Sequence, residues 1–526
     1  PKKIVIYTCP KWKEFILKKS IKLFIENNFN LGNFIKEIMS DLEKENICYM
    51  SAHEMREKIK NQEITSEEIT EIIIERIEKI NSIINAYCTP TFDLARASAK
   101  KADQMVKKGE KLGIMQGVPI SIKDETETKG IRTTYGSKLM ENNIPGNDAT
   151  IVKRMRDAGV VILGKTNTPA FGYKGETDNL IFGVTKNPWN LDRTPGGSSG
   201  GAASAVASGL SPIAIGSDGG GSIRIPSSFC GVFGIKATFG RIPQNLMQTS
   251  GYLGTFVHKG PIVRYVRDAA LVLDIIAGQD DSDRYSVPKP NYSYIERLNE
   301  TPKKLKIGYS LDLGYAEELD TEVENAVLNG IQRFEEFGWS IEKSQIKLKK
   351  RNPELTMTII WSSGFGYSLG RFLEAWQNKM DPAFVKLIKL GLNYSAKQIK
   401  TAEFYREQIY SDICSAFKNI DILITPTMPC TAFKIGNSSL IDDESGLTNI
   451  TINGKNITAL GWLPFTYPFN ISGHPAASIP CGWSSDGFPI GMQIVGKRFD
   501  ELTVLQVSKA FEDVAPWQDK KPKFYK

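Results

Sequence analysis

GGSSGG (residues 196–201) and GSDGGGSIRIP (residues 216–226) are the most distinctive stretches of this sequence. Glycine lets a backbone approach a ligand closely, and a glycine-rich loop can point successive N–H groups into one concavity. An oxyanion hole requires such an arrangement. An Ala- and Ser-rich helix and a strand are predicted between the two stretches, so that adjacent elements would present both loops. Together they predict an anion-stabilising site that carries serine hydroxyls.

A lysine lies upstream, in GVPISIKD at residues 117–124. Lys123 follows an apolar, strand-like run, where a charged lysine is costly. Burial is expected to lower its pKa, so that the neutral amine becomes usable as a base. A simple turn is the plain alternative for any one of these loops, whereas the two loops and the lysine together favour a functional site.

The segments around the loops predict an α/β fold. Val160–Leu163 and Ile213–Ile215 are short, continuously apolar and rich in β-branched residues, which is typical of strands buried on both faces of a sheet. Residues 149–156 and 202–207 have helical character and lie between these strands and their neighbours. We therefore expect a mixed β-sheet core surrounded by helices. Further strands are predicted at residues 422–424, around Ile479 and at residues 493–495.

The chain has 526 residues, which is well above the size of one small domain. We expect an amino-terminal helical extension at residues 1–50 and a main domain at residues 51–526. A capping-box pattern at residues 65–68 predicts the start of a helix. Residues 281–415 are more helical and more charged, and we expect them to form an elaboration over the sheet.

Charge is unevenly distributed along the chain. Seven lysines and two glutamates give residues 1–30 a net charge of +5, against +7 for the whole chain. The remainder is close to neutral, which argues against a nucleic-acid-binding surface across the body. Apolar residues recur at helical spacing between Leu17 and Ile25. A helix packed on the main body and an interfacial membrane helix at residues 11–26 are both compatible with that pattern.

The cysteines and histidines restrict the chemistry. The seven cysteines are scattered and form no C-x-x-C pair, which is typical of reduced thiols and argues against a zinc cluster. Only His53, His258 and His474 are present, so a site with several histidine ligands is nearly excluded. No apolar run reaches the ~20 residues of a membrane span, and lysines interrupt the amino-terminal stretch that a signal peptide would need. We expect a cytoplasmic protein without a metal or other cofactor.

Two further motif matches compete for the site. GVVILGKT at residues 159–166 satisfies the G-x-x-x-x-G-K-[ST] pattern of a phosphate-binding P-loop. A P-loop requires a turn at its middle residues, whereas the β-branched residues of VVIL favour an extended strand. GGSSG at residues 196–200 satisfies G-x-S-x-G, the nucleophile elbow of α/β-hydrolases. That mechanism requires a downstream histidine, for which only His258 and His474 are available.

Taken together, these motifs resemble those of the amidase signature family. The resemblance extends from about residue 52 to residue 515. The double loop is its most specific part, because Ser198 and Ser222 are 24 positions apart, a spacing that this family keeps. Ala237 is a departure, since the family usually has proline here in a Lys-Pro-Thr motif. The matching segments are residues 117–124, 164–167, 196–201, 218–226 with the positions that follow to 243, 425–427 and 468–480.

The resemblance implies an amidase signature fold and an amidase, a hydrolase that cleaves linear amide C–N bonds through a serine acyl-enzyme. It implies a triad in which Ser222 is the nucleophile, Ser198 the bridging cis-serine and Lys123 the base. This agrees with the chemistry, because a serine must lose its proton as it attacks and a neutral lysine can take it. The backbone N–H groups expected to hold the oxyanion are those of Gly219, Gly220, Gly221 and Ser222. The residues expected to support the loops or their hydrogen bonds are Ser121, Ser199, Asp218 and Arg224.

Two other functions stay open. Within the family, the A subunit of the tRNA-dependent amidotransferases frees ammonia from glutamine, which would imply partner subunits and a tRNA. That subgroup usually has threonine where Gly219 stands and Gln-Pro where Ile225 and Pro226 stand. The sequence therefore favours a stand-alone enzyme with a small-molecule amide substrate and no nucleic acid. A catalytically inactive binding scaffold is the alternative of another class, and the intact triad disfavours it.

The identity of the amide is not readable from the sequence. The acyl pocket in this family is built largely by the variable stretch, here residues 281–415. Its Phe, Trp, Tyr and Leu content favours apolar or aromatic acyl groups only weakly. A homodimer is compatible with the sequence.

Overall fold

The computed structural model describes residues 31–244, 255–439 and 445–524. The chain divides into two units, Pro1–Tyr49 and Met50–Lys526. Helix α2 (Leu31–Tyr49) is the described part of the first unit. The helix expected within residues 11–26 lies outside the described residues. In the ranges that are described, no helix combines the length and the apolar character that crossing a membrane would need.

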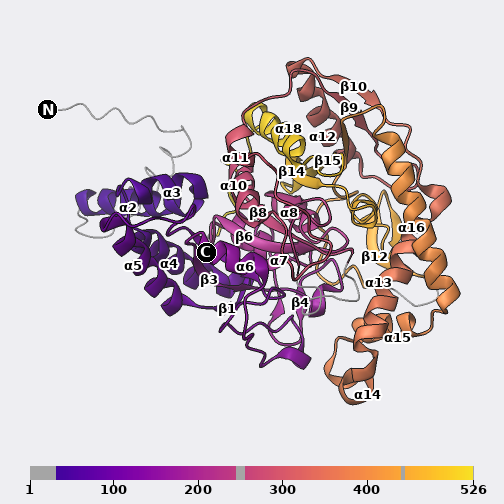
Figure 1. Cartoon of the computed structure of the whole chain (residues 1–526), viewed down its shortest axis with the longest axis horizontal. Coiled ribbons are helices and arrows are strands. Elements are labelled where there is room, and N and C mark those ends of the chain that lie inside the picture. The colour runs from indigo at the N-terminus through magenta and orange to yellow at the C-terminus, as the bar shows by residue number, and fades with distance from the viewer. Residues whose placement is uncertain (1–30, 245–254, 440–444, 525–526) are drawn as a thin grey trace. The chain divides into compact units, whose positions relative to one another are not determined.

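One β-sheet of eleven strands organises the second unit (Figure 1). In their order across the sheet, the strands are β1 (Tyr87–Pro90), β3 (Val161–Thr166), β2 (Pro119–Lys123), β6 (Ile213–Asp218), β8 (His258–Val263), β7 (Phe233–Lys236), β14 (Ala476–Trp483), β15 (Pro489–Gly496), β11 (Ile422–Pro426), β9 (Lys306–Tyr309) and β10 (Ser340–Lys343). β3, β2 and β6 pair in parallel, as do β11, β9 and β10, and the other pairs are antiparallel. The expected mixed sheet and α/β class are confirmed.

Two inner strands of the sheet, β3 and β6, are buried along their whole length. β3 and β6 contain the two apolar, β-branched runs from which strands were predicted. The stretch that matches the P-loop pattern is therefore an extended strand, and Lys165 lies inside β3 instead of in a phosphate-binding turn. The other predicted strands are confirmed as parts of β11, β14 and β15.

Helices surround the sheet. α4 (Ser66–Ile84) begins after Thr65, whose side chain forms the predicted capping box with Glu68. The other α-helices described in this unit are α3 (Ala52–Lys60), α5 (Phe92–Lys107), α6 (Thr150–Asp157), α7 (Gly200–Ala207), α8 (Arg224–Cys230), α10 (Val266–Ile276), α11 (Tyr294–Arg297), α12 (Thr321–Gln332), α13 (Pro353–Leu369), α14 (Leu373–Trp376), α15 (Pro382–Leu392), α16 (Ala396–Ala416), α17 (Pro468–Ile471) and α18 (Glu501–Val514).

Small side chains allow α7 to lie close to the sheet. Ala202, Ala203 and Ala207 of this helix are fully buried, and they share a hydrophobic cluster with Ala214 of β6 and Ile262 of β8. Large residues at these positions would push the helix away from the strands. The first glycine-rich loop, which leads into α7, is consequently held against β6.

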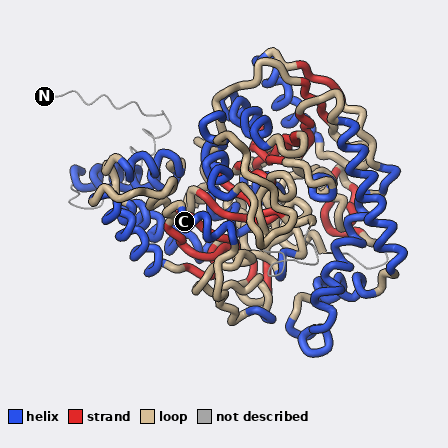
Figure 2. Tube along the Cα trace, viewed as in Figure 1, coloured by secondary structure: helices blue, strands red, loops and turns tan. Residues whose placement is uncertain are grey.

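The segment at residues 281–415 forms most of α12 to α16 and also supplies β9 and β10. α13 packs against both α15 and α16, and Figure 2 shows these helices in blue beside one another. β9 and β10 extend the main sheet at one edge and were not predicted. Each has only four residues, and β10 is largely exposed, so neither carries the apolar run that marks the inner strands.

Candidate active site

The carboxyl ends of two neighbouring parallel strands bring the candidate residues together. Lys123 is the last residue of β2, and Asp218 is the last residue of β6, its parallel partner. Ser198 lies two positions before α7, and Ser222 lies two positions before α8. The residues of the expected triad therefore come from one strand end and from the two loops that lead into helices.

Lys123 and Ser198 are in direct contact. The Nζ atom of Lys123 lies 2.6 Å from Oγ of Ser198 and 2.6 Å from Oγ of Ser217. It also lies 3.0 Å from a carboxylate oxygen of Glu125. The lysine side chain is fully buried, so these three oxygens replace water around its amino group. This arrangement suits a base that acts on a hydroxyl group.

Ser199 links the two serine-bearing loops. Its backbone N–H donates to the carbonyl oxygen of Ser222 at 3.2 Å. Its hydroxyl donates to the carbonyl oxygen of Ser217 at 3.1 Å and accepts from the backbone N–H of Ser217 at 3.2 Å. The peptide bond between Gly197 and Ser198 is cis. Ser199 thus holds the first loop against both β6 and the second loop.

Asp218 and Arg224 fix the shape of the second loop. The Asp218 carboxylate accepts from the N–H groups of Gly221 at 2.8 Å and Ile223 at 3.2 Å. Arg224 donates to both of its oxygens at 2.9 Å, and Asn470 donates to one of them at 2.8 Å. Burial alone would raise the pKa of Asp218, but the Arg224 guanidinium holds it well below its usual range. These two residues hold the loop from inside the protein.

Three of the four N–H groups expected to hold an oxyanion are open. Among the described residues, no acceptor pairs with the N–H groups of Gly219, Gly220 and Ser222. The N–H of Gly221 is engaged, because it donates to Asp218. Gly221 has a φ of +132°, a conformation that favours glycine. The expected set of four donors is therefore reduced to three, since a carboxylate within the loop takes the fourth.

The surroundings of Lys123 change its acidity. Burial lowers the pKa of Lys123 to about 8, although the Glu125 carboxylate favours the charged form. A lysine at its ordinary pKa of ~10.4 would be almost wholly protonated at neutral pH. Because the pKa of Lys123 is lowered, the neutral amine is far more populated near neutral pH than in a free lysine. The form that a base requires is thus present under ordinary conditions.

Glu125, Ser217 and Lys259 belong to this network but were not predicted. The Glu125 carboxylate lies 3.5 Å from the amino group of Lys259 and accepts from the Ser217 hydroxyl at 3.3 Å. Lys259 lies in β8, the antiparallel neighbour of β6. The available signal was a charged residue beside or within an apolar strand. Ser121 was expected to join the network, but among the described residues its hydroxyl makes no hydrogen bond to Lys123, Glu125, Ser198 or Ser217.

Lys165, the lysine of the P-loop match, is occupied inside the protein. Its amino group donates to the carbonyl oxygen of Thr126 and to the hydroxyls of Thr128 at 2.9 Å and Thr133 at 3.0 Å. Burial lowers the pKa of Lys165 to about 8. Fully buried in a strand and surrounded by protein acceptors, this lysine does not face a nucleotide site.

The two buried histidines contact other groups. Nδ1 of His474 lies 3.0 Å from the Ser472 hydroxyl, and Nδ1 of His258 lies 2.7 Å from the carbonyl oxygen of Phe256. Within the described residues, neither imidazole hydrogen-bonds to a serine of the two glycine-rich loops. Nor do three or more His, Cys, Asp or Glu side chains in those ranges form a group that could hold a metal ion.

Helix α13 covers the second loop. A Cβ atom added to Gly219 would lie 2.7 Å from the indole ring of Trp361, and one added to Gly220 would lie 3.2 Å from the terminal methyl of Met357. Nε1 of Trp361 donates to the carbonyl oxygen of Tyr173 at 3.1 Å, which fixes the ring. The segment at residues 281–415 thereby places an aromatic and an apolar side chain directly over the glycines.

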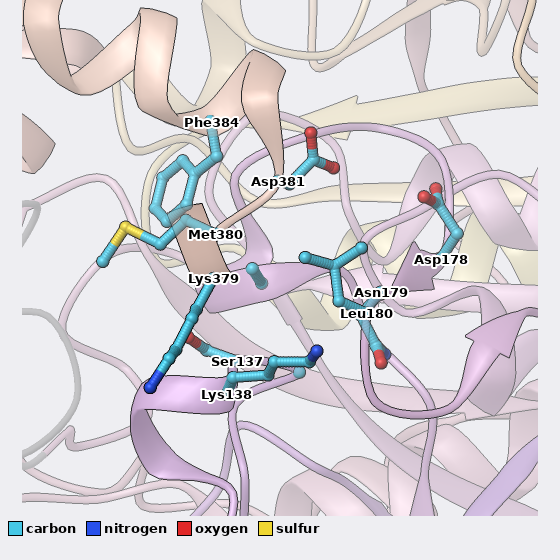
Figure 3. A pocket seen from close by; sticks show the side chains of 11 residues that line it. Ser137, Lys138, Asp178, Asn179, Leu180, Lys379, Met380, Asp381 and Phe384 are labelled. Atoms are coloured by element: carbon cyan, nitrogen blue, oxygen red, sulfur yellow. The ribbon is translucent and has the colours of Figure 1, made fainter. Parts of the chain in front are cut away.

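A separate small pocket lies beside Asp381 and Phe384 (Figure 3). Asp381 accepts from the hydroxyl of Tyr173 at 2.8 Å and from the amino group of Lys174 at 3.2 Å, and the same amino group also pairs with Asp178 at 2.8 Å. None of the predicted site residues lines this pocket. Its lining residues are 136–138, 170, 178–180, 379–381 and 384.

The model of the amidase family matches residues 68–505. The chain belongs to the amidase signature family. It is 37% identical to the A subunit of the glutamyl-tRNA(Gln) amidotransferase from Sulfurihydrogenibium sp. (strain YO3AOP1), over 90% of this chain and 98% of that protein. It is 36% identical to an acylamidase of Rhodococcus erythropolis, over 91% of this chain and 98% of the relative. Among solved structures, a bacterial aryl acylamidase of the same family aligns with a TM-score of 0.82 and 31% identity, over 90% of this chain and 97% of that chain.

Membership of the amidase signature family accounts for the eleven-stranded mixed sheet with its surrounding helices. Family membership alone does not identify the reaction, because the relatives include both acylamidases and amidotransferase subunits.

Proposed function

We propose that this amidase signature protein is a stand-alone amidase that hydrolyses a small-molecule carboxylic amide through a serine acyl-enzyme. The observation that carries the proposal is the 2.6 Å contact between Nζ of Lys123 and Oγ of Ser198. Burial lowers the pKa of this lysine to about 8, so the neutral amine is accessible. A base joined to a hydroxyl in this way can pass a proton from one oxygen to another.

In the proposed acylation, Oγ of Ser222 attacks the carbonyl carbon of the amide. Its proton passes to Oγ of Ser198, whose own proton passes to the neutral amine of Lys123. The carbonyl oxygen becomes an oxyanion, which the open N–H groups of Gly219, Gly220 and Ser222 would hold. Each such donor contributes about 3–4 kcal/mol in comparable sites.

The tetrahedral intermediate then collapses. The C–N bond breaks, and the leaving nitrogen takes back a proton from Lys123 through Ser198, so that ammonia or an amine departs. The acyl group remains esterified to Ser222. Water attacks this ester while Lys123 takes a proton from the water through Ser198. The C–O bond to Ser222 then breaks, the Ser222 oxygen takes that proton back by the same route, and a carboxylic acid is released.

The second candidate is the A subunit of a tRNA-dependent amidotransferase, which the 37% identity to such a protein favours. Two observations support the stand-alone enzyme instead. Gly219 and Ile225 depart from the residues usual in that subgroup. The ring of Trp361 also occupies the space that a side chain at position 219 would need.

The test is a hydrolysis assay with the purified protein alone. Aliphatic, aromatic and long-chain amides are offered beside glutamine, without added protein, metal, nucleotide or tRNA. We expect hydrolysis of at least one simple amide, and none by the Ser222→Ala variant. Activity that appears only with partner subunits would favour the amidotransferase, and activity abolished by a chelator would contradict the metal-free mechanism. An inactive scaffold would neither turn over an amide nor react with a fluorophosphonate.

A further inference from the structure

We infer that Glu125 and Lys259 are positioning residues that set both the orientation and the ionisation of the Lys123 amino group. The inference rests on the proposed function, in which Lys123 is the base. Glu125 follows β2 by two positions, and Lys259 projects from β8, so separate elements of the sheet bring the three charged groups together. At most 7% of each side chain is exposed.

The hydrogen bonds assign a direction to the lone pair of a neutral Lys123. A neutral amine has two N–H groups and one lone pair for its three neighbours. An ionised Glu125 carboxylate can only accept, so one N–H points to it across 3.0 Å. The Ser217 hydroxyl donates its own proton to Glu125 at 3.3 Å, so it accepts the second N–H across 2.6 Å. The lone pair is left for the hydroxyl of Ser198, which is the direction that proton transfer requires.

Burial and the second cation together explain how a lysine beside a carboxylate can be neutral. Glu125 alone would stabilise the ammonium form of Lys123 and so weaken it as a base. Lys259 lies 3.5 Å from the other oxygen of the same carboxylate and balances its charge. With Lys259 and Glu125 both charged, a neutral Lys123 leaves the cluster without net charge, whereas a protonated one leaves a buried net charge of one, which is costly.

The acidity of the two central groups agrees with this account. Burial alone would raise the pKa of Glu125, but the ammonium groups of Lys123 and Lys259 lower it to about 2. Burial lowers the pKa of Lys123, Glu125 raises it, and Lys259 lowers it again. Asp218 also raises the pKa of Lys123, although Arg224 at 2.9 Å balances that charge.

Two further charged groups, Glu127 and Lys165, lie near Lys259. Glu127 and Lys165 both interact electrostatically with it. Lys259 also donates to the Thr126 hydroxyl at 3.2 Å, which holds its amino group in place. These groups stay the same in every variant of Glu125 and Lys259, so they do not obscure a comparison between those variants.

The test is the pH dependence of the rate at which a fluorophosphonate modifies Ser222, followed by mass spectrometry of the intact chain. This probe needs no knowledge of the substrate. In the wild type the rate should rise with pH as Lys123 loses its proton. Lys259→Gln should move that rise to higher pH by about one unit. At pH values below the rise, this variant should therefore react about tenfold more slowly than the wild type. Glu125→Gln, which keeps an acceptor but removes the anion, should move it to lower pH.

Two further variants serve as controls. Lys259→Arg retains the cation and should restore a rise close to that of the wild type. Lys165→Met removes an equally buried lysine whose amino group contacts threonines instead of Glu125, so it should shift the rise much less than Lys259→Gln does. If Glu125 and Lys259 were only structural, every variant would be slower at all pH values, and the rise would not move in opposite directions in Lys259→Gln and Glu125→Gln. Melting curves identify the variants that fold.

Three results would overturn the inference while leaving the proposed function intact. They are shifts of Lys259→Gln and Glu125→Gln in the same direction, a shift in Lys165→Met equal to that in Lys259→Gln, and no shift beyond about 0.2 units. If Lys259→Gln does not fold, Glu125→Gln decides, because it matches glutamate in size and its rise must move to lower pH. A wild type that is not modified at Ser222 would overturn the proposed function and this inference together.

Discussion

Gly219 and Trp361 fit together only because position 219 carries no side chain. A Cβ atom there would lie 2.7 Å from the indole ring, closer than nonbonded carbon atoms approach. Gly219 belongs to the loop that leads into α8, whereas Trp361 belongs to α13. The loop that carries the candidate nucleophile therefore depends on a side chain from a helix that is distant in the sequence.

The first prediction tests this dependence. Gly219→Ala should lower the melting temperature and slow fluorophosphonate labelling, since overpacking of this size costs about 1–3 kcal/mol. Adding Trp361→Ala should remove the clash and recover much of the labelling rate. The Trp361→Ala single variant completes the double-mutant cycle. Strictly additive effects in the double variant would contradict the coupling.

The second prediction separates the two serines. Ser222→Ala removes the only oxygen that can form the acyl-enzyme, so both turnover and fluorophosphonate labelling should be lost. Ser198→Ala keeps the nucleophile but removes the relay, and should slow acylation about 10²–10⁴-fold. Stopped assays with an amide, together with mass spectrometry, measure both effects. Ser198→Ala with an unchanged acylation rate would remove this serine from the mechanism.

The third prediction concerns Asp218, whose carboxylate supports the second glycine-rich loop. Asp218→Asn leaves Arg224 buried without its counter-charge, which should lower the free energy of unfolding by about 3–5 kcal/mol at neutral pH. The pKa of Asp218 is lowered by folding, so its stabilising effect is complete above the unfolded value of ~3.9 and is lost as pH falls toward the folded value. Denaturant unfolding at neutral pH and below pH ~3.9 should thus show a smaller difference between wild type and variant in acid. An equal difference at both would contradict the assignment.

The fourth prediction concerns the two motif matches that compete with the triad. His474→Ala and Lys165→Met should lose stability, because both side chains are buried, but the folded variants should label and turn over at rates close to the wild type. A thousandfold slower acylation in His474→Ala with a normal melting profile would instead support an α/β-hydrolase arrangement.

The sequence predicts most of the fold for physical reasons. The apolar, β-branched runs of β3 and β6 favour buried strands, and that preference correctly rejects the P-loop match at Lys165. Parallel neighbours end at the same edge of a sheet, so a lysine at the end of β2 lies beside the loop that follows β6. The family resemblance supplied the pairing of Lys123 with Ser198, and the two side chains are in contact.

The other features of the site depend on contacts between segments that are distant in the sequence, and no local sequence pattern reveals such contacts. Lys259 meets Glu125 only because β8 returns beside β6, and Trp361 meets Gly219 only because α13 folds over the loop. The engagement of the Gly221 N–H follows from the direction of the Asp218 side chain. A glycine-rich sequence predicts that N–H groups can converge, but not which of them a neighbouring carboxylate will take.

The central claim is that Lys123, acting through Ser198, activates Ser222. The most direct measurement is the pH dependence of the acylation rate in the wild type and in Lys123→Ala. Lys123 accepts a proton only when neutral, so the wild-type rate should rise with pH through a value near 8, below the ~10.4 of a free lysine. The folded Lys123→Ala variant should be nearly inactive and should lose that rise. A variant that retains both the rate and the wild-type pH profile would show that another group is the base, and would contradict the account.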